Sequence, residues 1–221
     1  ELASNDGYLL QRFVERGIPC LGIDPAGEPV RAARERGVTT WNEFFGPAVA
    51  ERVLRTHGHA DVVVANNVLA HVADLGGFVD AIATVLGDRG IASIEVPYVG
   101  DLVGRVEFDT IYHQHLCYFS VAALDHLFTA HGLVLRRVRP LSIHGGSLRL
   151  EVGREACERV EVDAWLERER QQGVDTLGFY ADFSRRVAQL RDDLRGLLAE
   201  LKAAGERGGG YGAAAKAATL L

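Results

Sequence analysis

Along the chain, short runs of apolar residues alternate with stretches in which the apolar residues have helical spacing. Near-continuous apolar runs predict buried strands of a parallel sheet covered on both faces. The predicted strands are residues 20–24, 61–65 and 91–96. The predicted helices between them are residues 7–16, 28–36, 47–56 and 76–86. Glycines follow three of these helices and are predicted to end them, namely Gly17, Gly37 and Gly90.

The second half of the pattern predicts a different closing motif. A helix over residues 121–130, ended by Gly132, precedes two strands, residues 133–141 and 147–152. The link between these strands is too short for a crossover helix, so they should form an antiparallel hairpin. A mostly parallel, Rossmann-like α/β sheet that closes on such a hairpin is typical of class I methyltransferases. Dinucleotide dehydrogenases more often stay parallel throughout.

The chain after the hairpin has a composition of its own. Residues 155–204 are rich in Arg, Glu, Leu and Ala, and the pattern from Asp175 onward predicts one long amphipathic helix. We therefore expect three parts: a core over residues 1–153, a helical connecting arm over 154–206, and the start of a further domain over 207–221. No Met is present, and Glu1-Leu2 is typical of a strand already under way, so we expect that the natural amino terminus is missing. A glycine turn opening a helix at residues 208–216 predicts that a further domain follows.

Composition excludes several classes of function. The 221 residues carry a net charge of -6, and 24 Lys and Arg are interleaved with 30 Asp and Glu, so no nucleic-acid surface is expected. The three cysteines lie far apart without a C-x-x-C, which supports neither a disulfide framework nor a zinc cage. No apolar run is long enough to span a membrane. We expect a soluble, cytoplasmic, monomeric protein.

The first turn of the sheet carries the pattern of an adenosine site. Glu1, Ser4, Asn5 and Gly7 lie at a strand end, a tight turn and the mouth of a helix, and Asp24 ends the next strand, where a carboxylate can accept both ribose hydroxyls. Only Gly7 of a G-x-G-x-x-G is present, which favours S-adenosylmethionine over NAD. The alternative is that Asp24 only caps the helix after Pro25.

Two further strand ends carry polar or aromatic candidates. Asn66, Asn67 and His71 follow the strand at 61–65, where amides and an imidazole can hold the amino-acid part of a cofactor or a substrate oxygen. They could also be turn formers and an ordinary helix residue. Phe44 and Phe45 lie where an adenine ring would be flanked, although aromatic residues there are more often part of the core.

The loop before the helix at 121–130 concentrates groups that titrate near neutral pH. Residues 112–120 contain two imidazoles, two phenols and a hydroxyl, and they follow a parallel strand at the edge where such sheets bind ligands. This placement predicts proton-transfer chemistry. The alternative for His113 and His115 is a metal pair, which no carboxylate cluster accompanies, so no metal is expected.

Seven motifs together resemble the deoxysugar C-methyltransferases of antibiotic sugar pathways, which methylate carbon 3 of nucleotide-linked 4-keto sugars. In order they read E-L-A-S-N-D-G-Y-L-L, G-I-D-P, N-N-V-L-A-H-V, I-E-V-P-Y, Y-H-Q-H-L-C-Y-F-S, H-G-G-S-L-R and Y-G-A-A-A-K. The resemblance covers residues 1–153 and resumes at 211–216. Family members also carry an amino-terminal zinc-binding lobe and a carboxyl-terminal Rossmann-like domain.

The resemblance implies a role for each candidate. His115 is the base that takes the proton beside the ketone, Tyr112 and His71 orient the sugar or donate to its oxyanion, and Asn67 helps hold the keto sugar. S-adenosylmethionine is bound by Glu1, Ser4, Asn5, Gly7, Asp24, Phe45 and Asn66. The further substrate contacts implied are Tyr98, His113, Gln114, His144 and Ser147, although His144 and Ser147 could simply turn the hairpin.

Two departures from the family pattern leave other functions open. Gln114 stands where the family has Glu, and Ala3 where it usually has glycine. Gln114 can form hydrogen bonds but cannot take a proton. Two alternatives therefore stay open. One is an O- or N-methyltransferase acting on another small molecule, and the other is a unit that binds the cofactor without turnover.

Overall fold

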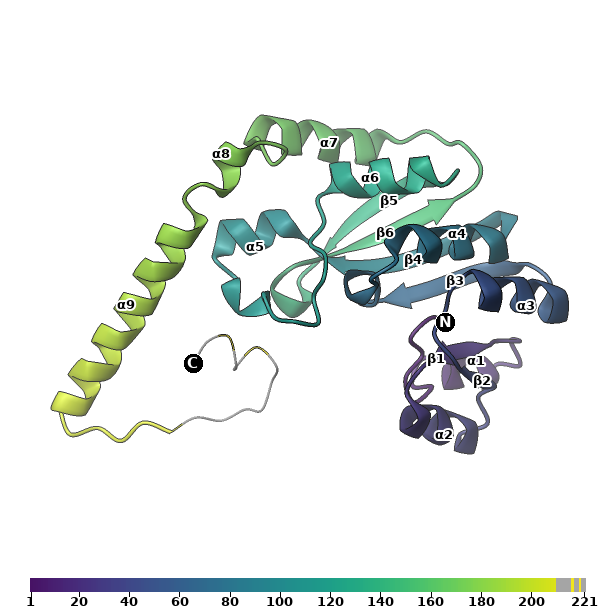
Figure 1. The fold of residues 1–221 in the computed structure, drawn as a ribbon, viewed down its shortest axis with the longest axis horizontal. Coiled ribbons are helices and arrows are strands. Elements are labelled where there is room, and N and C mark those ends of the chain that lie inside the picture. The colour runs from purple at the N-terminus through teal and green to yellow at the C-terminus, as the bar shows by residue number, and fades with distance from the viewer. Residues whose placement is uncertain (210–215, 217–218, 220–221) are drawn as a thin grey trace.

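The computed structural model describes residues 1–209, 216 and 219. Helices pack on one face of the larger, twisted sheet, and a long helix extends away from it (Figure 1). The strands are β1 (Gly22–Asp24), β2 (Thr40–Asn42), β3 (Ala60–Asn66), β4 (Leu86–Pro97), β5 (Val134–Leu141) and β6 (Ser147–Gly153). The helices are α1 (Gln11–Val14), α2 (Gly27–Glu35), α3 (Pro47–His57), α4 (Leu75–Val85), α5 (Val99–Arg105), α6 (Val121–Ala130), α7 (Val160–Gln172), α8 (Leu177–Tyr180) and α9 (Phe183–Ala203). Short 3-10 turns are η1 (Leu69–His71), η2 (Phe108–Thr110) and η3 (Ile143–Gly145).

The sheet is mostly parallel and ends in an antiparallel hairpin, which confirms the predicted fold class. The larger part has the order β3-β4-β6-β5, and β6 runs antiparallel to both neighbours. β1 and β2 form a parallel pair. Leu2 joins the two parts, because its N–H donates to the Val64 carbonyl at 2.8 Å while it bridges Ile23 in parallel. The first residues therefore lie at the centre of the sheet.

The largest hydrophobic core lies between the sheet and its helices. Strand residues Ile94, Leu135 and Leu150 are fully buried, as are Ile82 on α4 and Phe128 on α6. Their alternation in the strands and their spacing in the helices are the pattern that predicted these elements. This packing fixes the carboxyl ends of the strands, from which the candidate residues project.

Two local predictions are wrong. The helix expected over residues 7–16 is confined to α1, because Gly7 has φ +75° and takes part in the preceding turn. Gly90, expected to end a helix, lies inside β4, where a Cβ would come within 2.8 Å of the Ala60 carbonyl oxygen. Gly17, Gly37 and Gly132 all have positive φ at helix ends, as expected.

The arm is also divided where one helix was expected. α8 and α9 are separate, and α7 ends earlier at Gly173, whose φ is +70°. The chain bends because Phe179 and Phe183 pack on the buried face of α5 and the Tyr180 hydroxyl donates to the Val174 carbonyl. Tertiary contacts thus override the helical pattern, and α9 extends away from the sheet beyond its first turn (Figure 1). The predicted glycine turn and helix at 208–216 lie mostly outside the described residues.

Among residues 1–209, 216 and 219, no helix combines the length and apolar character needed to cross a membrane.

Candidate functional site

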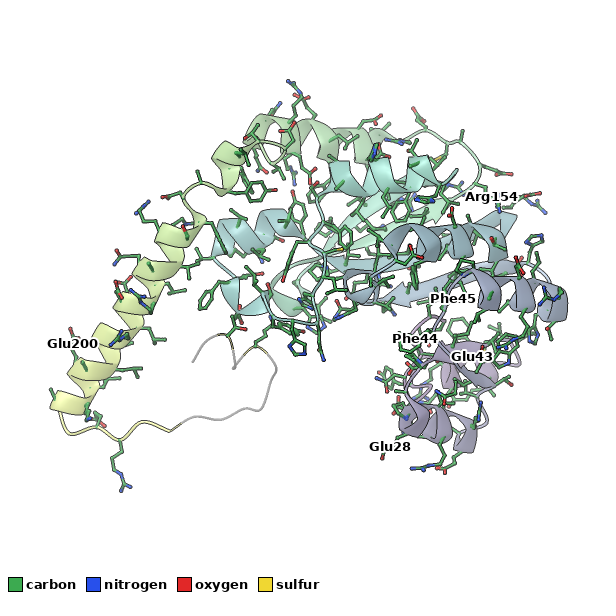
Figure 2. The ribbon with its side chains drawn as sticks, viewed as in Figure 1. Glu28, Glu43, Phe44, Phe45, Arg154 and Glu200 are labelled. Atoms are coloured by element: carbon green, nitrogen blue, oxygen red, sulfur yellow. The ribbon has the colours of Figure 1, made fainter. Side chains whose placement is uncertain are left out.

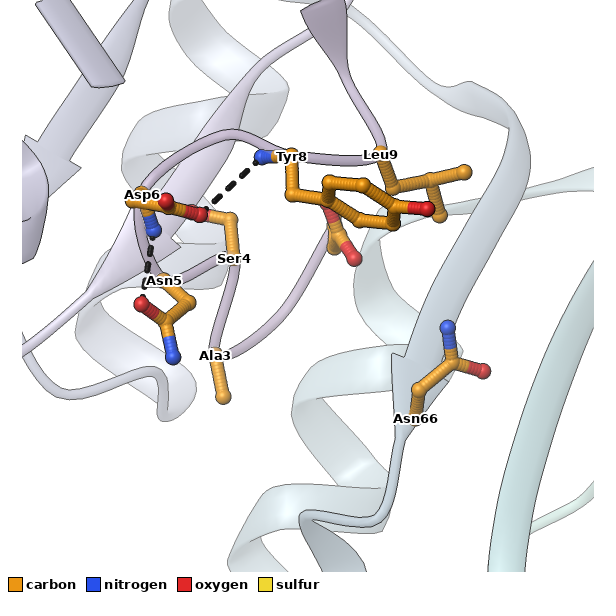
Figure 3. Close-up of a pocket in the computed structure, with 8 residues that line it drawn as sticks. Ala3, Ser4, Asn5, Asp6, Tyr8, Leu9 and Asn66 are labelled. Atoms are coloured by element: carbon orange, nitrogen blue, oxygen red, sulfur yellow. Dashed lines mark hydrogen bonds between the residues drawn. The ribbon is translucent and has the colours of Figure 1, made fainter. Parts of the chain in front are cut away.

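A cavity of about 480 Å³ lies where Glu1-Leu2 enters the sheet (Figure 3). It brings together four of the predicted cofactor residues, Glu1, Ser4, Asn5 and Asn66. The remaining lining residues are Ala3, Asp6, Tyr8 and Leu9. The cavity therefore opens at the carboxyl ends of central strands, the edge at which α/β sheets bind ligands.

The turn over residues 3–7 shapes one wall of the cavity. Ala3 and Asn5 both have a left-handed backbone, with φ of +54° and +51°. Asparagine tolerates this conformation, whereas alanine is strained in it, so the glycine usual at position 3 would fit more easily. Gly7, predicted to contact the cofactor, packs closely on one side: a Cβ there would lie 3.0 Å from Val38 Cγ2. Its role in this structure is to let the turn approach α2.

Two residues that line the cavity carry buried polar atoms without a partner in the described part of the chain. Glu1 Oε2 and Ser4 Oγ are buried and have no hydrogen-bond partner among the described residues. Burial raises the pKa of the Glu1 carboxyl to about 7, because the charged form loses water. Buried polar atoms without partners are rare in folded proteins, and a bound polar ligand would satisfy them.

Asp24 is held by the turn as well as by the next helix. Its Oδ2 accepts from the Asn5 N–H at 2.9 Å and its Oδ1 from the Ala26 N–H at 2.8 Å. Both the cofactor role and the capping alternative are therefore compatible with its position, because each carboxylate oxygen can accept a second hydrogen bond. Only 7% of Asp24 is exposed.

The aromatic candidates separate into one packed ring and one free ring. Phe45, predicted to contact the cofactor, packs edge-on against Phe78 of α4, with ring centroids 5.4 Å apart, and so belongs to the core. Phe44 is 82% exposed. Side chains of both lie beside β2 (Figure 2). Phe44 is therefore the more exposed of the two rings, and the cofactor contact of the partly buried Phe45 stays a prediction.

A second group of candidate residues surrounds His115. Its Nδ1 lies 2.8 Å from the Thr110 carbonyl oxygen, which can only accept, so Nδ1 carries the proton. Its Nε2 lies 3.2 Å from the Tyr112 hydroxyl and has a lone pair. Burial lowers the pKa of His115, and a charge on nearby His71 lowers it further. This arrangement gives a neutral imidazole with a defined basic nitrogen.

His71 approaches the same imidazole from the other side. The two rings have centroids 4.9 Å apart, and His71 Nδ1 bonds the Gln114 carbonyl at 2.8 Å. The loop is tied to η1 by the Leu116 N–H, which donates to the Ala70 carbonyl. Asn67, between Asn66 and η1, has φ +54° and continues the ladder through a bond to the Glu95 carbonyl. One segment, residues 66–71, thus links the cavity wall to the histidine cluster.

Three other predicted substrate residues lie at the surface. His113 and Gln114 are exposed, and the His113 ring lies edge-on to Tyr112, with centroids 6.3 Å apart. His144 is exposed in the hairpin turn with φ +56°.

Two of the predicted substrate residues, Tyr98 and Ser147, have buried side chains. Tyr98 packs edge-on against Trp165 of α7, and burial raises the pKa of its hydroxyl. Ser147 is 1% exposed and donates to the Ile143 carbonyl at 3.3 Å, which closes the hairpin turn. Both side chains therefore serve packing in this structure.

Sequence reasoning missed several groups around the site. Three of them are the Thr110 carbonyl, the Tyr118 hydroxyl that bonds it at 3.3 Å, and the partly buried Glu95–Arg149 ion pair beside Asn66. A main-chain carbonyl has no sequence signal. Glu95 in an apolar strand did offer one, because a buried carboxylate requires a partner.

Comparisons with known proteins identify the family of the chain. A methyltransferase domain family matches residues 1–138, and a C-methyltransferase C-terminal domain family matches residues 142–221. The C-methyltransferase NovU of Streptomyces niveus is 34% identical over 224 residues, which cover 100% of this chain and 53% of NovU. The chain thus spans about half the length of this curated relative.

Solved structures resemble the fold at low identity. A methyltransferase from Anabaena variabilis has a TM-score of 0.55 and 13% identity, covering 70% of this chain and 76% of that one. Magnesium protoporphyrin IX methyltransferase from Synechocystis, solved with S-adenosylhomocysteine, has a TM-score of 0.53 and 15% identity, covering 70% and 72%. The predicted fold and family resemblance are confirmed: the chain belongs to the S-adenosylmethionine-dependent methyltransferase family.

Proposed function

We propose that the protein moves a methyl group from S-adenosylmethionine to the carbon beside the ketone of a nucleotide-linked 4-keto deoxysugar. The observation that carries this proposal is the imidazole of His115, whose Nδ1 proton is held by a carbonyl while Nε2 keeps its lone pair. Carbon is a poor nucleophile until a proton beside a carbonyl is removed, so transfer to carbon requires such a base. NovU, named a C-methyltransferase, supports the same reaction class.

Different side chains carry out different steps of the proposed reaction. His115 Nε2 takes the proton beside the ketone, and the electron pair of the C–H bond moves to the ketone oxygen as an enolate. The Tyr112 hydroxyl, 3.2 Å from that nitrogen, donates to the enolate oxygen. S-adenosylmethionine supplies an electrophilic methyl group on sulfur. The new bond forms from the enolate carbon to this methyl, and the ketone returns as the carbon–sulfur bond breaks.

The placement of ligands follows from the two groups of residues. Glu1, Ser4, Asn5 and Asn66 line the cavity that would hold the cofactor, and Asp24 supports the Asn5 turn and accepts ribose hydroxyls. His71, Asn67, His113, Gln114 and His144 would contact the sugar. We propose that residues 1–153 form the catalytic core and 154–206 the connecting arm.

The direct test is proton exchange at the reacting carbon. In deuterated water, a nucleoside diphosphate 4-keto deoxysugar should exchange the proton beside the ketone with the parent protein, and His115→Ala should abolish this exchange. Methyl transfer should fall by about 10² to 10⁴, the range for loss of a general base. S-adenosylhomocysteine affinity should stay near that of the parent.

His113→Ala is the matched control, because it removes an exposed imidazole two positions away in the same loop. We expect it to cost far less. Full turnover by His115→Ala, or a loss confined to His113→Ala, would show that His115 is not the base.

A further inference from the structure

A row of polar side chains crosses three strands beside the cavity. Asn66 on β3 is the register partner of Glu95 on β4, which is the register partner of Arg149 on β6. Paired residues on adjacent strands lie on one face and interact. The Arg149 guanidinium donates to Asn66 Oδ1 at 3.0 Å, to Glu95 Oε2 at 2.5 Å and to Ser93 Oγ at 3.4 Å.

This ion pair is partly removed from water. The Glu95 side chain is 8% exposed and that of Arg149 is 32% exposed. A guanidinium is a rigid planar fork that has donors and no acceptor, so the atom of Asn66 that faces it must be the amide oxygen. Arg149 therefore decides which way the Asn66 amide is turned.

The other end of the amide faces the cavity that Asn66 lines. Its nitrogen and oxygen point apart, with the oxygen turned away from the Ala3–Asn5 turn (Figure 3). The nitrogen bonds no acceptor among the described residues. Glu1 also lines this cavity, and its carboxylate can only accept hydrogen bonds while it is ionised. The cavity thus presents one acceptor and one fixed donor.

We propose that Arg149, held by Glu95, is a positioning residue that fixes the Asn66 amide as a hydrogen-bond donor to the cofactor. The matching chemistry is an amino-acid group, whose ammonium would face Glu1 and whose carboxylate would accept from Asn66. This inference rests on the proposed placement of S-adenosylmethionine in this cavity. It does not depend on the acceptor substrate.

The test measures S-adenosylhomocysteine affinity by calorimetry. Because Arg149→Met alone would leave Glu95 as a buried unpaired charge, it is combined with Glu95→Gln. We expect this double variant to bind about tenfold more weakly than the parent, the cost of about one hydrogen bond. In an Asn66→Ala background the same two changes should have no further effect, which a general loss of sheet stability would not reproduce.

Two more variants complete the design. Arg137→Met breaks the Arg137–Glu151 pair on the same sheet, which does not involve Asn66, and should bind like the parent. Asn66→Asp keeps the shape but replaces the donor by an acceptor, and should weaken binding more than tenfold. Thermal unfolding checks that each variant is folded.

Three results would overturn the inference. One is parent-like affinity in the Glu95→Gln, Arg149→Met variant while Asn66→Ala binds weakly. Another is a loss that persists undiminished in the Asn66→Ala background. The third is parent-like affinity in Asn66→Asp, which would also contradict the placement of the cofactor against Asn66. Transfer to the keto sugar is assayed separately, so failure of the proposed reaction would be recognised on its own.

Discussion

At the scale of single residues, one main-chain carbonyl determines the chemistry of the histidine cluster. The Thr110 oxygen accepts from His115 Nδ1 and from the Tyr118 hydroxyl, so the tautomer and the ring orientation are fixed together. Nε2 is left beside Tyr112, the hydroxyl proposed to stabilise the enolate. A base and an acid at 3.2 Å suit a reaction in which a proton leaves carbon as charge builds on oxygen.

The direction of the His115 pKa shift predicts the pH dependence of turnover. Because burial lowers this pKa, the neutral imidazole persists as pH falls, and the acid limb of kcat/KM should have its midpoint below ~6.5. Gln114→Glu adds a negative charge next to His115, which favours the protonated ring, so the midpoint should move upward. Gln172→Glu on α7 is the matched control, because it adds the same charge outside the loop. A parent midpoint above 6.5, or equal profiles for Gln114→Glu and the parent, would contradict this account.

The sequence predicted which residues belong to the candidate site better than it predicted where their side chains point. The strand-end pattern identified Glu1, Ser4, Asn5 and Asn66, which the structure brings into one cavity. Tyr98 and Ser147 lie in equally suggestive motifs but point into the core. Their orientation depends on α7 and on the hairpin turn, which are distant in sequence or set by local backbone geometry. A motif gives the residue type without the direction of the side chain.

At the scale of elements, a buried glutamate joins two helices of the outer layer. Glu169 on α7 is 2% exposed and accepts from the Val121 N–H at 2.7 Å and the Ala122 N–H at 2.9 Å. These are free donors at the amino terminus of α6, where a negative charge is also favoured by the helix dipole. Ser120 Oγ accepts from the Ala123 N–H. The start of α6, directly after the histidine loop, is therefore fully capped.

We expect Glu169→Gln to lower the free energy of unfolding by about 2 kcal/mol, because the amide offers one acceptor oxygen and no charge to the two N–H groups. Urea unfolding followed by circular dichroism measures this change. Glu167→Gln on the same helix is the control: Glu167 pairs with Arg170 at the exposed surface, and its loss should change the stability far less. Equal stability of the two variants would rule out a capping role for Glu169.

Most helices and strands followed from periodicity, and the exceptions have identifiable causes. α2, α3, α4, α6 and the hairpin lie close to their predicted positions, since their apolar faces pack on the sheet. Residues 7–16 and the arm have equally helical patterns. The left-handed Gly7 shortens the first, and contacts of Phe179 and Phe183 with α5 divide the second. These causes involve backbone conformation and distant packing, which periodicity does not contain.

At the scale of the whole molecule, the sheet brings the proposed cofactor cavity and the histidine loop to one edge. The cofactor cavity forms at the first turn, and the histidine loop is bound to η1, which directly follows β3. The family matches cover both halves of the chain, and their boundary falls near the tip of the β5–β6 hairpin. Because β6 lies between β4 and β5, the second matched region completes the sheet of the first.

The central claim is that the methyl group is transferred to carbon. Incubation with S-adenosylmethionine labelled with carbon-13 in the methyl group, and with a panel of nucleoside diphosphate 4-keto deoxysugars, tests it by NMR of the product. The account predicts a labelled methyl signal in the aliphatic carbon region, coupled to the carbon beside the ketone. A labelled methyl bonded to oxygen or nitrogen, or cofactor binding without any labelled product, would contradict it.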